Sequence, residues 1–262
     1  MLRLGLQTLL LSALVSASPL LKAVEWTPDY SLDADDVVAA IDGKTLVLKE
    51  ADYLAYLKAE GIKIGAPELD PEWITYNGTD IPDLDARDVE PHSLEARQTS
   101  CENTFSIVTD KTETFVDWDV QMSPVVCAVG AMDVTVSSGY SVANTVGGSA
   151  GIDLKFIKDR LGGSVGVDYS RTWTTSSTIM NKGTVQDGWC GVMITKPITT
   201  RRSGRQFRGC IGSTTQTGTW YADSHNEKAV NGISWVEGAI SMCTKRGNNP
   251  PLSRCNGQGN FI

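Results

Sequence analysis

Histidine is scarce in this sequence, and its scarcity restricts the chemistry available to the protein. Among 262 residues there are two histidines, His92 and His225. The cysteines lack paired Cys-x-x-Cys spacing, and a lone histidine cannot complete a usual zinc site. Asp223, Ser224 and His225 have the residue types of a catalytic triad, but consecutive residues rarely converge in that way. No glycine-rich phosphate loop precedes a helical pattern. We therefore expect no metal, no cofactor and no enzyme activity.

Long hydrophobic runs are missing after the first 17 residues. Residues 1–17 combine Arg3, a short apolar core over Leu4–Val15 and small residues ending at Ala17. This is the pattern of a secretory signal peptide, and its core is too short to span a bilayer. All six cysteines lie at or after Cys101, as expected for disulfides formed in an oxidising compartment. We predict an extracellular protein cleaved after Ala17.

Charge divides the chain into two unequal parts. Residues 1–97 have 18 acidic and 8 basic side chains, whereas residues 98–262 have 13 and 15. The acidic part ends in Leu-Glu-Ala-Arg at Arg97, which resembles the end of a propeptide cut by a kexin-type convertase. We therefore predict three parts: a signal peptide (1–17), an acidic propeptide (18–97) and a mature, disulfide-bonded domain (98–262).

The propeptide is expected to contain a small ββα unit and a disordered linker. An Asp-Gly pair between two apolar runs predicts a hairpin, because it supplies the positive φ of a type I′ turn. Helical spacing follows and stops at Gly61. The expected elements are Val37–Ile41, Thr45–Leu48 and a helix over Glu50–Glu60. From Ile64 to Arg97, proline and acidic residues dominate, which indicates an extended, protease-accessible linker.

Two segments of the mature part mirror each other about a short turn. Apolar residues fall at even positions over Val134–Phe156 and at odd positions over Val165–Ile179. Period two is typical of one-sided strands. If the chain folds back about Lys158–Asp159, paired positions add to 317, which sets Ile152 opposite Val165 and Ala150 opposite Val167. The alternative is two short hairpins of a sandwich, interrupted at Gly147-Gly148.

Both alternatives give a mainly β fold. The mature domain is predicted to be an antiparallel β-sandwich or an elongated aerolysin-like β-structure with a long hairpin, preceded by the ββα unit. Abundant Ser, Thr, Gly and Val and little helical pattern favour this class. Further strands are expected near Thr104–Val108, Thr114–Val120, Gly191–Thr195, Phe207–Ile211 and Ile233–Met242.

Six cysteines allow 15 disulfide connectivities. Cys127 and Cys190 also add to 317, so the hairpin register predicts that they bond at its base. Cys243 and Cys255 enclose a short loop with two prolines and are expected to pair locally. Cys101 and Cys210 remain as the third pair.

Two groups of residues are candidates for contact with a membrane or partner. The hairpin tip sets Phe156, Ile157 and Leu161 around the charged Lys158 and Arg160. This composition suits a tip that touches a membrane, or a short helix packed on the β domain. A hairpin of alternating polar and apolar residues is also what aerolysin-type toxins use to build a transmembrane barrel.

The second group is basic and suits an anionic partner such as lipid head groups, unless it is a solvated loop. It comprises Arg201, Arg202, Arg205 and Arg208. Five tryptophans of the mature part are candidates for a sugar-stacking set or for core: Trp118, Trp173, Trp189, Trp220 and Trp235.

Several runs together resemble one family of fungal secreted proteins, described as effector-like after a Colletotrichum effector candidate. They are Leu32–Val38, Trp118–Ser123, Ser138–Asn144, Asp168–Thr174, Thr199–Gly204 and Ser234–Gly238. The resemblance implies a secreted candidate effector of a plant-associated fungus and carries no known activity or site residues. We expect a non-enzymatic effector that acts at a host surface or membrane, including pore formation by the hairpin. The alternative is an extracellular binding module for a glycan or a host protein. A hydrolase of unrecognised type is the third hypothesis, and no nucleic-acid partner is expected.

Overall fold

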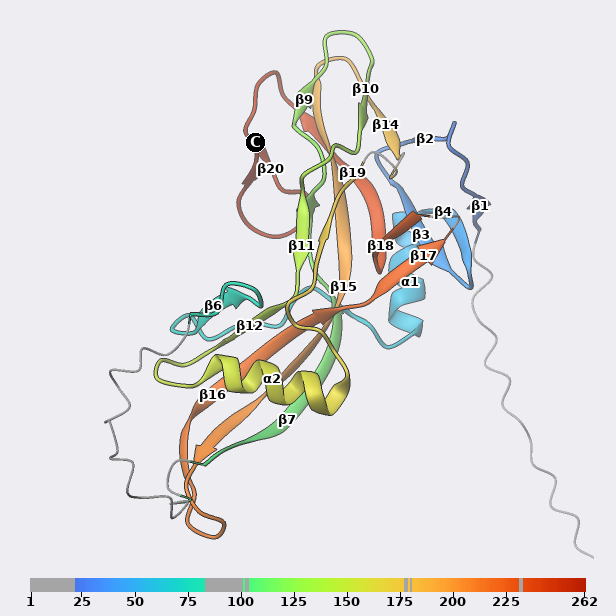
Figure 1. Cartoon of the computed structure of the whole chain (residues 1–262). Coiled ribbons are helices and arrows are strands. Elements are labelled where there is room, and N and C mark those ends of the chain that lie inside the picture. Colours follow the sequence, from blue (N-terminus) through green and yellow to red (C-terminus); the bar gives the residue numbers. More distant parts are fainter. Residues whose placement is uncertain (1–21, 83–100, 102–103, 177–178, 180, 231–232) are drawn as a thin grey trace, which may run out of the picture.

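The computed structural model describes residues 22–82, 101, 104–176, 179, 181–230 and 233–262. The predicted cleavage positions Ala17 and Arg97 lie outside these residues. The fold is mainly β with antiparallel pairing, as predicted from the sequence, and contains the helices α1 (Glu50–Ala59) and α2 (Leu154–Val165) (Figure 1). No helix in the described part of the chain is long and apolar enough to cross a membrane.

The strands within residues 22–82 are short. They are β1 (Val24–Glu25), β2 (Ser31–Leu32), β3 (Asp36–Ile41), β4 (Lys44–Lys49), β5 (Lys63–Ile64) and β6 (Ile74–Asn77). The following strands are β7 (Phe105–Val116), β8 (Val120–Gln121), β9 (Val126–Cys127), β10 (Met132–Thr135), β11 (Ser141–Ala143), β12 (Thr145–Gly148), β13 (Thr172–Thr174) and β14 (Lys182–Val185). The last are β15 (Trp189–Arg208), β16 (Thr215–His225), β17 (Glu227–Val230), β18 (Ile233–Val236), β19 (Gly238–Arg246), β20 (Leu252–Ser253) and β21 (Asn260–Phe261).

Strand β15 is the central strand of the main sheet and pairs with β7, β8, β9, β16 and β19. Its 20 residues would span roughly 65 Å at about 3.3 Å per residue. One edge of β15 pairs first with β19 and then with β16, and the other edge pairs with β9, β8 and β7 in turn. The change of partner falls at Pro197, which is opposite Gly238. The molecule is therefore elongated along β15 (Figure 1). The segments predicted separately at Gly191–Thr195 and Phe207–Ile211 largely belong to this one strand.

The predicted ββα unit is present. Strands β3 and β4 form an antiparallel hairpin in which Asp42 (φ 50°) and Gly43 (φ 75°) make the turn. Helix α1 follows, and Gly61 (φ 74°) lies directly after its end. Local signals are sufficient here, because the turn requires two consecutive positive φ values and Asp-Gly supplies them.

This unit is not a separate body, because it completes the main sheet. Strand β3 pairs with β19, opposite the edge that β19 presents to β15. The linker interpretation is wrong for the stretch up to residue 82. There, β5 pairs with β7 and β6 pairs with β12. The rest of the predicted linker, residues 83–97, lies outside the described residues.

The long hairpin forms only near its base. Strands β10 and β14 have the predicted register, with Met132 opposite Val185. The next pair is displaced by two residues, with Val142 opposite Trp173. Beyond it the prediction is wrong: β12 pairs with β16 and β6, and the chain then enters α2. The predicted pairs Ile152–Val165 and Ala150–Val167 do not form, so the alternative of short strand pairs is closer to the structure.

Helix α2 has its own local signals. The Asp153 side chain accepts a hydrogen bond from the Phe156 N–H (2.9 Å) and caps the helix. Gly166, with φ 69°, ends it in the left-handed region. Ile157 and Leu161 are one helical turn apart and lie on the buried face. They pack with Val146, Trp220 and Ala222 against β12 and β16, in the half of the sheet that we call the lower half.

The three disulfides are those predicted: Cys101–Cys210, Cys127–Cys190 and Cys243–Cys255. Cys127 lies directly opposite Cys190 in the β9–β15 pairing, so the parity argument holds at the base of the hairpin. Cys127–Cys190 joins β9 to the start of β15, and Cys101–Cys210 joins the chain before β7 to the chain after the end of β15.

Candidate functional site

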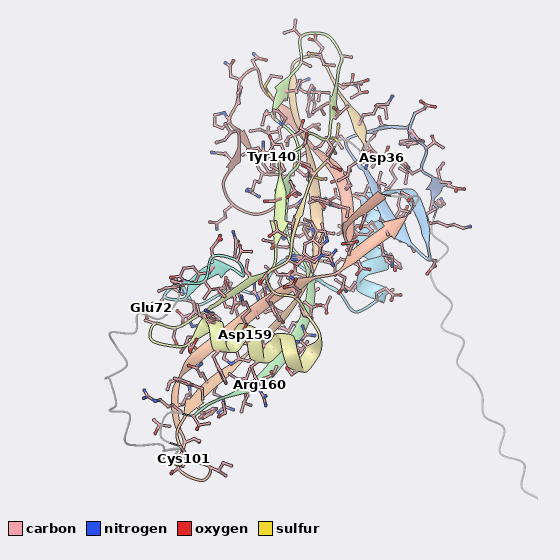
Figure 2. The ribbon with its side chains drawn as sticks, viewed as in Figure 1. Asp36, Glu72, Cys101, Tyr140, Asp159 and Arg160 are labelled. Carbon is pink, nitrogen blue, oxygen red and sulfur yellow. A yellow bond between two sulfur atoms is a disulfide. The ribbon has the colours of Figure 1, made fainter. Side chains whose placement is uncertain are left out.

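The predicted tip residues are part of α2 and do not form an exposed apolar tip. Ile157 and Leu161 are 0% and 2% exposed. The Phe156 ring centroid lies 5.7 Å from that of Phe105. Lys158 donates to the Gly78 carbonyl oxygen (3.1 Å). Arg160, labelled in Figure 2, is exposed on α2. The membrane-contact interpretation of this tip is therefore wrong for Ile157 and Leu161, which α2 buries against the sheet, whereas Phe156 is half-buried. The alternative, a short helix packed on the β domain, is the arrangement that the structure has.

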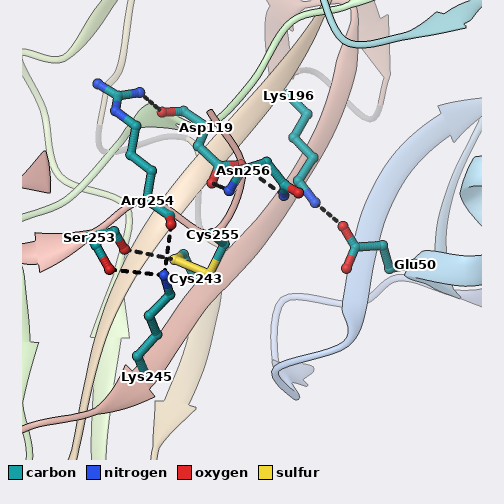
Figure 3. The surroundings of a disulfide bond; sticks show 9 residues. All are labelled: Glu50, Asp119, Lys196, Cys243, Lys245, Ser253, Arg254, Cys255 and Asn256. Carbon is teal, nitrogen blue, oxygen red and sulfur yellow. Dashed lines mark hydrogen bonds and ion pairs between the residues drawn. A yellow bond between two sulfur atoms is a disulfide. The ribbon is translucent and has the colours of Figure 1, made fainter. Parts of the chain in front are cut away.

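A group of metal-ligand residue types lies at the Cys243–Cys255 disulfide (Figure 3). The two sulfur atoms are bonded to each other, so they are not free to ligate a metal. The Asp119 carboxylate accepts a hydrogen bond from the Asn256 N–H (2.6 Å). Lys245 donates to the Arg254 carbonyl oxygen (2.8 Å). These two hydrogen bonds join residues 254–256 to β19 and to Asp119, and their role is structural.

The arginine cluster does not form one basic patch. Its members alternate between the two faces of β15. Arg201 is 7% exposed and forms a bidentate ion pair with Asp223, with both N···O distances 2.7 Å. Arg205 pairs with Asp110 in the same bidentate way.

The other two arginines lie on the opposite face of β15. Arg202 donates to the Ser224 hydroxyl (3.4 Å), and Arg208 lies over the Phe105 ring. The prediction of a shared anion site over this cluster is wrong. The cause is strand alternation, together with the carboxylate partners of Arg201 and Arg205.

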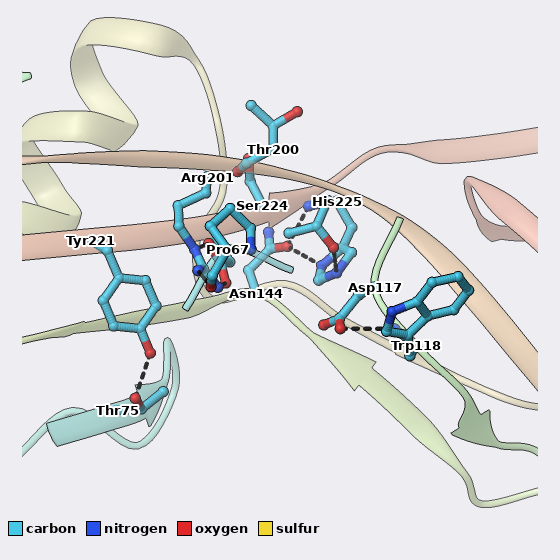
Figure 4. A network of polar contacts seen from close by, with 12 residues as sticks. Pro67, Thr75, Asp117, Trp118, Asn144, Thr200, Arg201, Tyr221, Ser224 and His225 are labelled. Carbon is cyan, nitrogen blue, oxygen red and sulfur yellow. Dashed lines mark hydrogen bonds and ion pairs between the residues drawn. The ribbon is translucent and has the colours of Figure 1, made fainter. Parts of the chain in front are cut away.

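Around Arg201 the polar groups form a network with the N-terminal part of the chain (Figure 4). Arg201 also donates to the Pro67 carbonyl oxygen (2.8 Å) and lies 5.0 Å from the ring centroid of Tyr221. The Tyr221 hydroxyl forms a hydrogen bond with the Thr75 hydroxyl. The Tyr221 ring stacks on the Trp73 ring, with the ring centroids 5.4 Å apart. Burial raises the pKa of the Tyr221 hydroxyl, so it stays neutral. The network holds residues 67–75 on the sheet.

His225 is a structural residue of the same region. Its Nε2 lies 3.0 Å from the Thr199 hydroxyl, and its backbone N–H donates to Asn144 Oδ1 (2.8 Å). Burial lowers the pKa of His225 to about 4, so the ring is neutral at neutral pH. Asp223 is bound to Arg201 and is not available to orient this ring. The residues 223–225 therefore do not form a triad.

The tryptophans mostly belong to the core. Trp220, Trp173 and Trp235 are 0%, 6% and 7% exposed, which excludes them from a surface for stacking sugars. Trp118 and Trp189 are partly exposed.

A cavity of about 70 Å³ lies between β3, β4 and the β18–β19 region. Trp26 Nε1 and Asn181 Oδ1, from two residues that line it, have no hydrogen-bond partner among the described residues.

An exposed apolar loop connects β9 to β10, and sequence reasoning missed it. Residues 128–132 read Ala-Val-Gly-Ala-Met and contain no polar side chain. Val129 is 93% exposed and Met132 is 44% exposed. We call these five residues the apolar loop. Its signal in the sequence is a run of five residues without a polar side chain, which is unfavourable at a surface unless it has a function. Ala128 is buried, and Met132 is the first residue of β10. The loop lies at one end of the molecule, opposite the β15–β16 turn (Figure 1).

Two hydrogen bonds and a disulfide anchor the apolar loop. The Gly130 N–H donates to Asp187 Oδ1 (2.8 Å), and the Ala128 N–H donates to the Trp189 carbonyl oxygen (2.9 Å). The Cys127–Cys190 disulfide directly precedes it. Trp189 is partly exposed, and the Arg246 guanidinium lies 6.0 Å from its ring centroid. An aromatic ring and a cation thus accompany an exposed apolar surface.

The chain matches no protein-family model, no curated protein and no solved structure. Its function must therefore be argued from the apolar loop, the disulfides and the sequence resemblance.

Proposed function

We propose that this protein is a secreted fungal effector that acts without catalysis at the surface of a host membrane. The signal peptide pattern, the three disulfides and the resemblance to effector-like proteins support an extracellular site of action. In this proposal the chain is cleaved after Ala17 and after Arg97. The apolar loop is the contact, and it replaces the tip residues that the sequence offered as one candidate for this role.

The observation that carries the proposal is the exposure of apolar side chains on a loop whose backbone is hydrogen-bonded and next to a disulfide. Val129 and Met132 are exposed although the preceding disulfide and the Asp187 hydrogen bond fix the backbone around them. Exposed apolar surface that is already ordered loses little conformational entropy on binding. Such a loop gains free energy by entering the boundary between lipid head groups and acyl chains.

Two neighbours of the loop, Trp189 and Arg246, fit this boundary, whereas the exposed Asp133 and Asp187 carboxylates beside it must stay on its aqueous side. Trp189 presents an aromatic ring with a polar N–H, a composition favoured at membrane interfaces. Arg246 supplies a cation for lipid phosphates. The loop itself has no charge and Arg246 is one cation beside it, so we expect binding to zwitterionic membranes and only a weak dependence on salt.

Vesicle flotation tests the proposal. Purified protein is mixed with phosphatidylcholine vesicles, and the bound fraction is compared with that of Val129→Asp. We expect Val129→Asp to bind at least tenfold more weakly, since a carboxylate must then be desolvated. The matched control is Ile211→Asp, which changes a fully exposed apolar residue in the turn at the opposite end. It should bind like the parent.

Two results would overturn the proposal: equal vesicle binding by the parent and Val129→Asp, or no binding by either. If the parent does not bind vesicles, yet plant tissue responds to the parent and not to Val129→Asp, the loop contacts a host protein. Binding to a glycan array that is insensitive to Val129→Asp would instead support the glycan-binding alternative.

A further inference from the structure

Residues 22–82, which we call the N-terminal segment, are joined to the rest of the described chain by strand pairing at four places. Strand β3 pairs with β19, β6 with β12, β5 with β7 and β2 with β14. Strands β3, β6 and β5 extend the main sheet by pairing with the otherwise free edges of β19, β12 and β7. Without the segment, the edges of β19, β12 and β7 would present unpaired N–H and C=O groups, which promote aggregation.

Side chains add polar contacts across the same interface. Lys196 is 3% exposed and forms an ion pair with Glu50 of α1 (Figure 3). Arg201 donates to the Pro67 carbonyl oxygen, and Lys158 donates to that of Gly78. Removing Glu50 would leave the buried Lys196 charge without this partner, which is strongly unfavourable.

An apolar cluster crosses the interface as well. Tyr53 and Leu57 of α1 are 2% and 0% exposed. They belong to a cluster that includes Val116 of β7 and Ala239 of β19. At the other half of the sheet, Trp73 stacks on Tyr221. The segment therefore covers buried surface on both halves of the elongated sheet.

No covalent bond other than the chain itself joins the two parts. Every cysteine lies at or after Cys101, so the disulfides do not involve the N-terminal segment. We propose that the N-terminal segment remains bound after cleavage at Arg97 and is a permanent subunit of the processed protein. The working form is then a non-covalent heterodimer of an acidic N-terminal chain and the disulfide-bonded chain beginning at Gln98. The partner of the exposed edges is this segment. The inference rests on the cleavage in the proposed function.

The test uses the full chain with a site for a sequence-specific protease inserted after position 97. The substitution Arg97→Ala prevents cleavage there by the convertase of the cell that produces the protein. After complete cutting, verified on a denaturing gel, the protein is run by size exclusion at micromolar and nanomolar concentrations. We expect both chains to elute together and to separate only in denaturant. Elution of a folded 98–262 chain alone would overturn the inference.

Matched variants test which residues stabilise the interface between the N-terminal segment and the chain beginning at Gln98. Trp73→Ala and Glu50→Lys should each raise the dissociation constant of the cut protein at least tenfold. Glu68→Ala changes an exposed residue of the same segment and should leave it unchanged. Dissociation that is the same in all three would contradict the assigned interface. Intact-mass analysis of the native secreted protein is a separate test of cleavage, so loss of the proposed processing would not be mistaken for loss of the interface.

Discussion

Arg201 and Asp223 are directly opposite each other on β15 and β16 and form a buried bidentate ion pair. Both side chains are nearly inaccessible to water. Arg201 also holds the carbonyl of Pro67, so the pair connects two strands and the N-terminal segment.

Breaking this pair should destabilise the protein strongly. Asp223→Ala leaves a buried guanidinium without its carboxylate, and we expect the free energy of unfolding to fall by about 3–5 kcal/mol. Asp110→Ala breaks the bidentate pair with Arg205, which is exposed, and should change the unfolding midpoint little. Chemical denaturation of the two variants measures the difference. Equal loss in both would show that burial does not control the strength of these pairs.

Stability should decrease in acid because of His225. Burial holds its folded pKa at about 4, below the usual unfolded value of about 6.5. Between these values the unfolded chain binds a proton that the folded chain does not, so stability falls as pH falls through this window. The full effect is about 3 kcal/mol below pH 4.

The variant His225→Gln isolates this contribution. We expect the difference in unfolding free energy between parent and variant to change from pH 7 to pH 4 and to be constant above pH 7. His92 is present in both proteins and cancels in the comparison. A difference that does not depend on pH would mean that the His225 ring is accessible to water.

The sequence predicted those features that local signals determine. Asp42-Gly43 and Gly61 set the β3–β4 hairpin and the end of α1, because each needs a positive φ. Cys127 and Cys190 were paired correctly because parity is preserved near β9 and β15. These features depend on few residues that are close in the chain or share one register.

Long-range pairing was not predictable in the same way. The partner of β3 is β19, about two hundred residues away, and no pattern in either strand selects the other. A short helix at the tip was one of the two alternatives, but the full length of α2 was missed because Ile152, Leu154 and Phe156 satisfy strand parity. The helix itself is capped by Asp153 and Gly166. The apolar loop had a signal in the sequence, the run of residues 128–132 without a polar side chain. Such a run can be core or surface, and only the tertiary packing determines which.

The packing of α2 gives a third prediction. Ile157→Ala removes a fully buried side chain and should cost about 2–5 kcal/mol of stability. Arg160→Ala, on the exposed side of the same helix, should stay within about 0.5 kcal/mol. Neither change should alter vesicle binding of the folded protein. Normal stability with lost vesicle binding in Ile157→Ala would restore the tip as the membrane contact.

Two glycines give a final prediction with opposite signs. Gly163 lies within α2, and a Cβ there would meet no atom within 4 Å outside its own helix and chain neighbours. Gly163→Ala should stabilise the protein by roughly 0.5–1 kcal/mol, because glycine is unfavourable within a helix. Gly204 lies in β15, where a Cβ would overlap the Val108 carbonyl oxygen of β7. Gly204→Ala should therefore force the strands apart and cost at least about 2 kcal/mol. Thermal unfolding of both variants decides the point: a Gly204→Ala protein as stable as the parent would contradict the close β7–β15 pairing on which the lower half of the sheet depends.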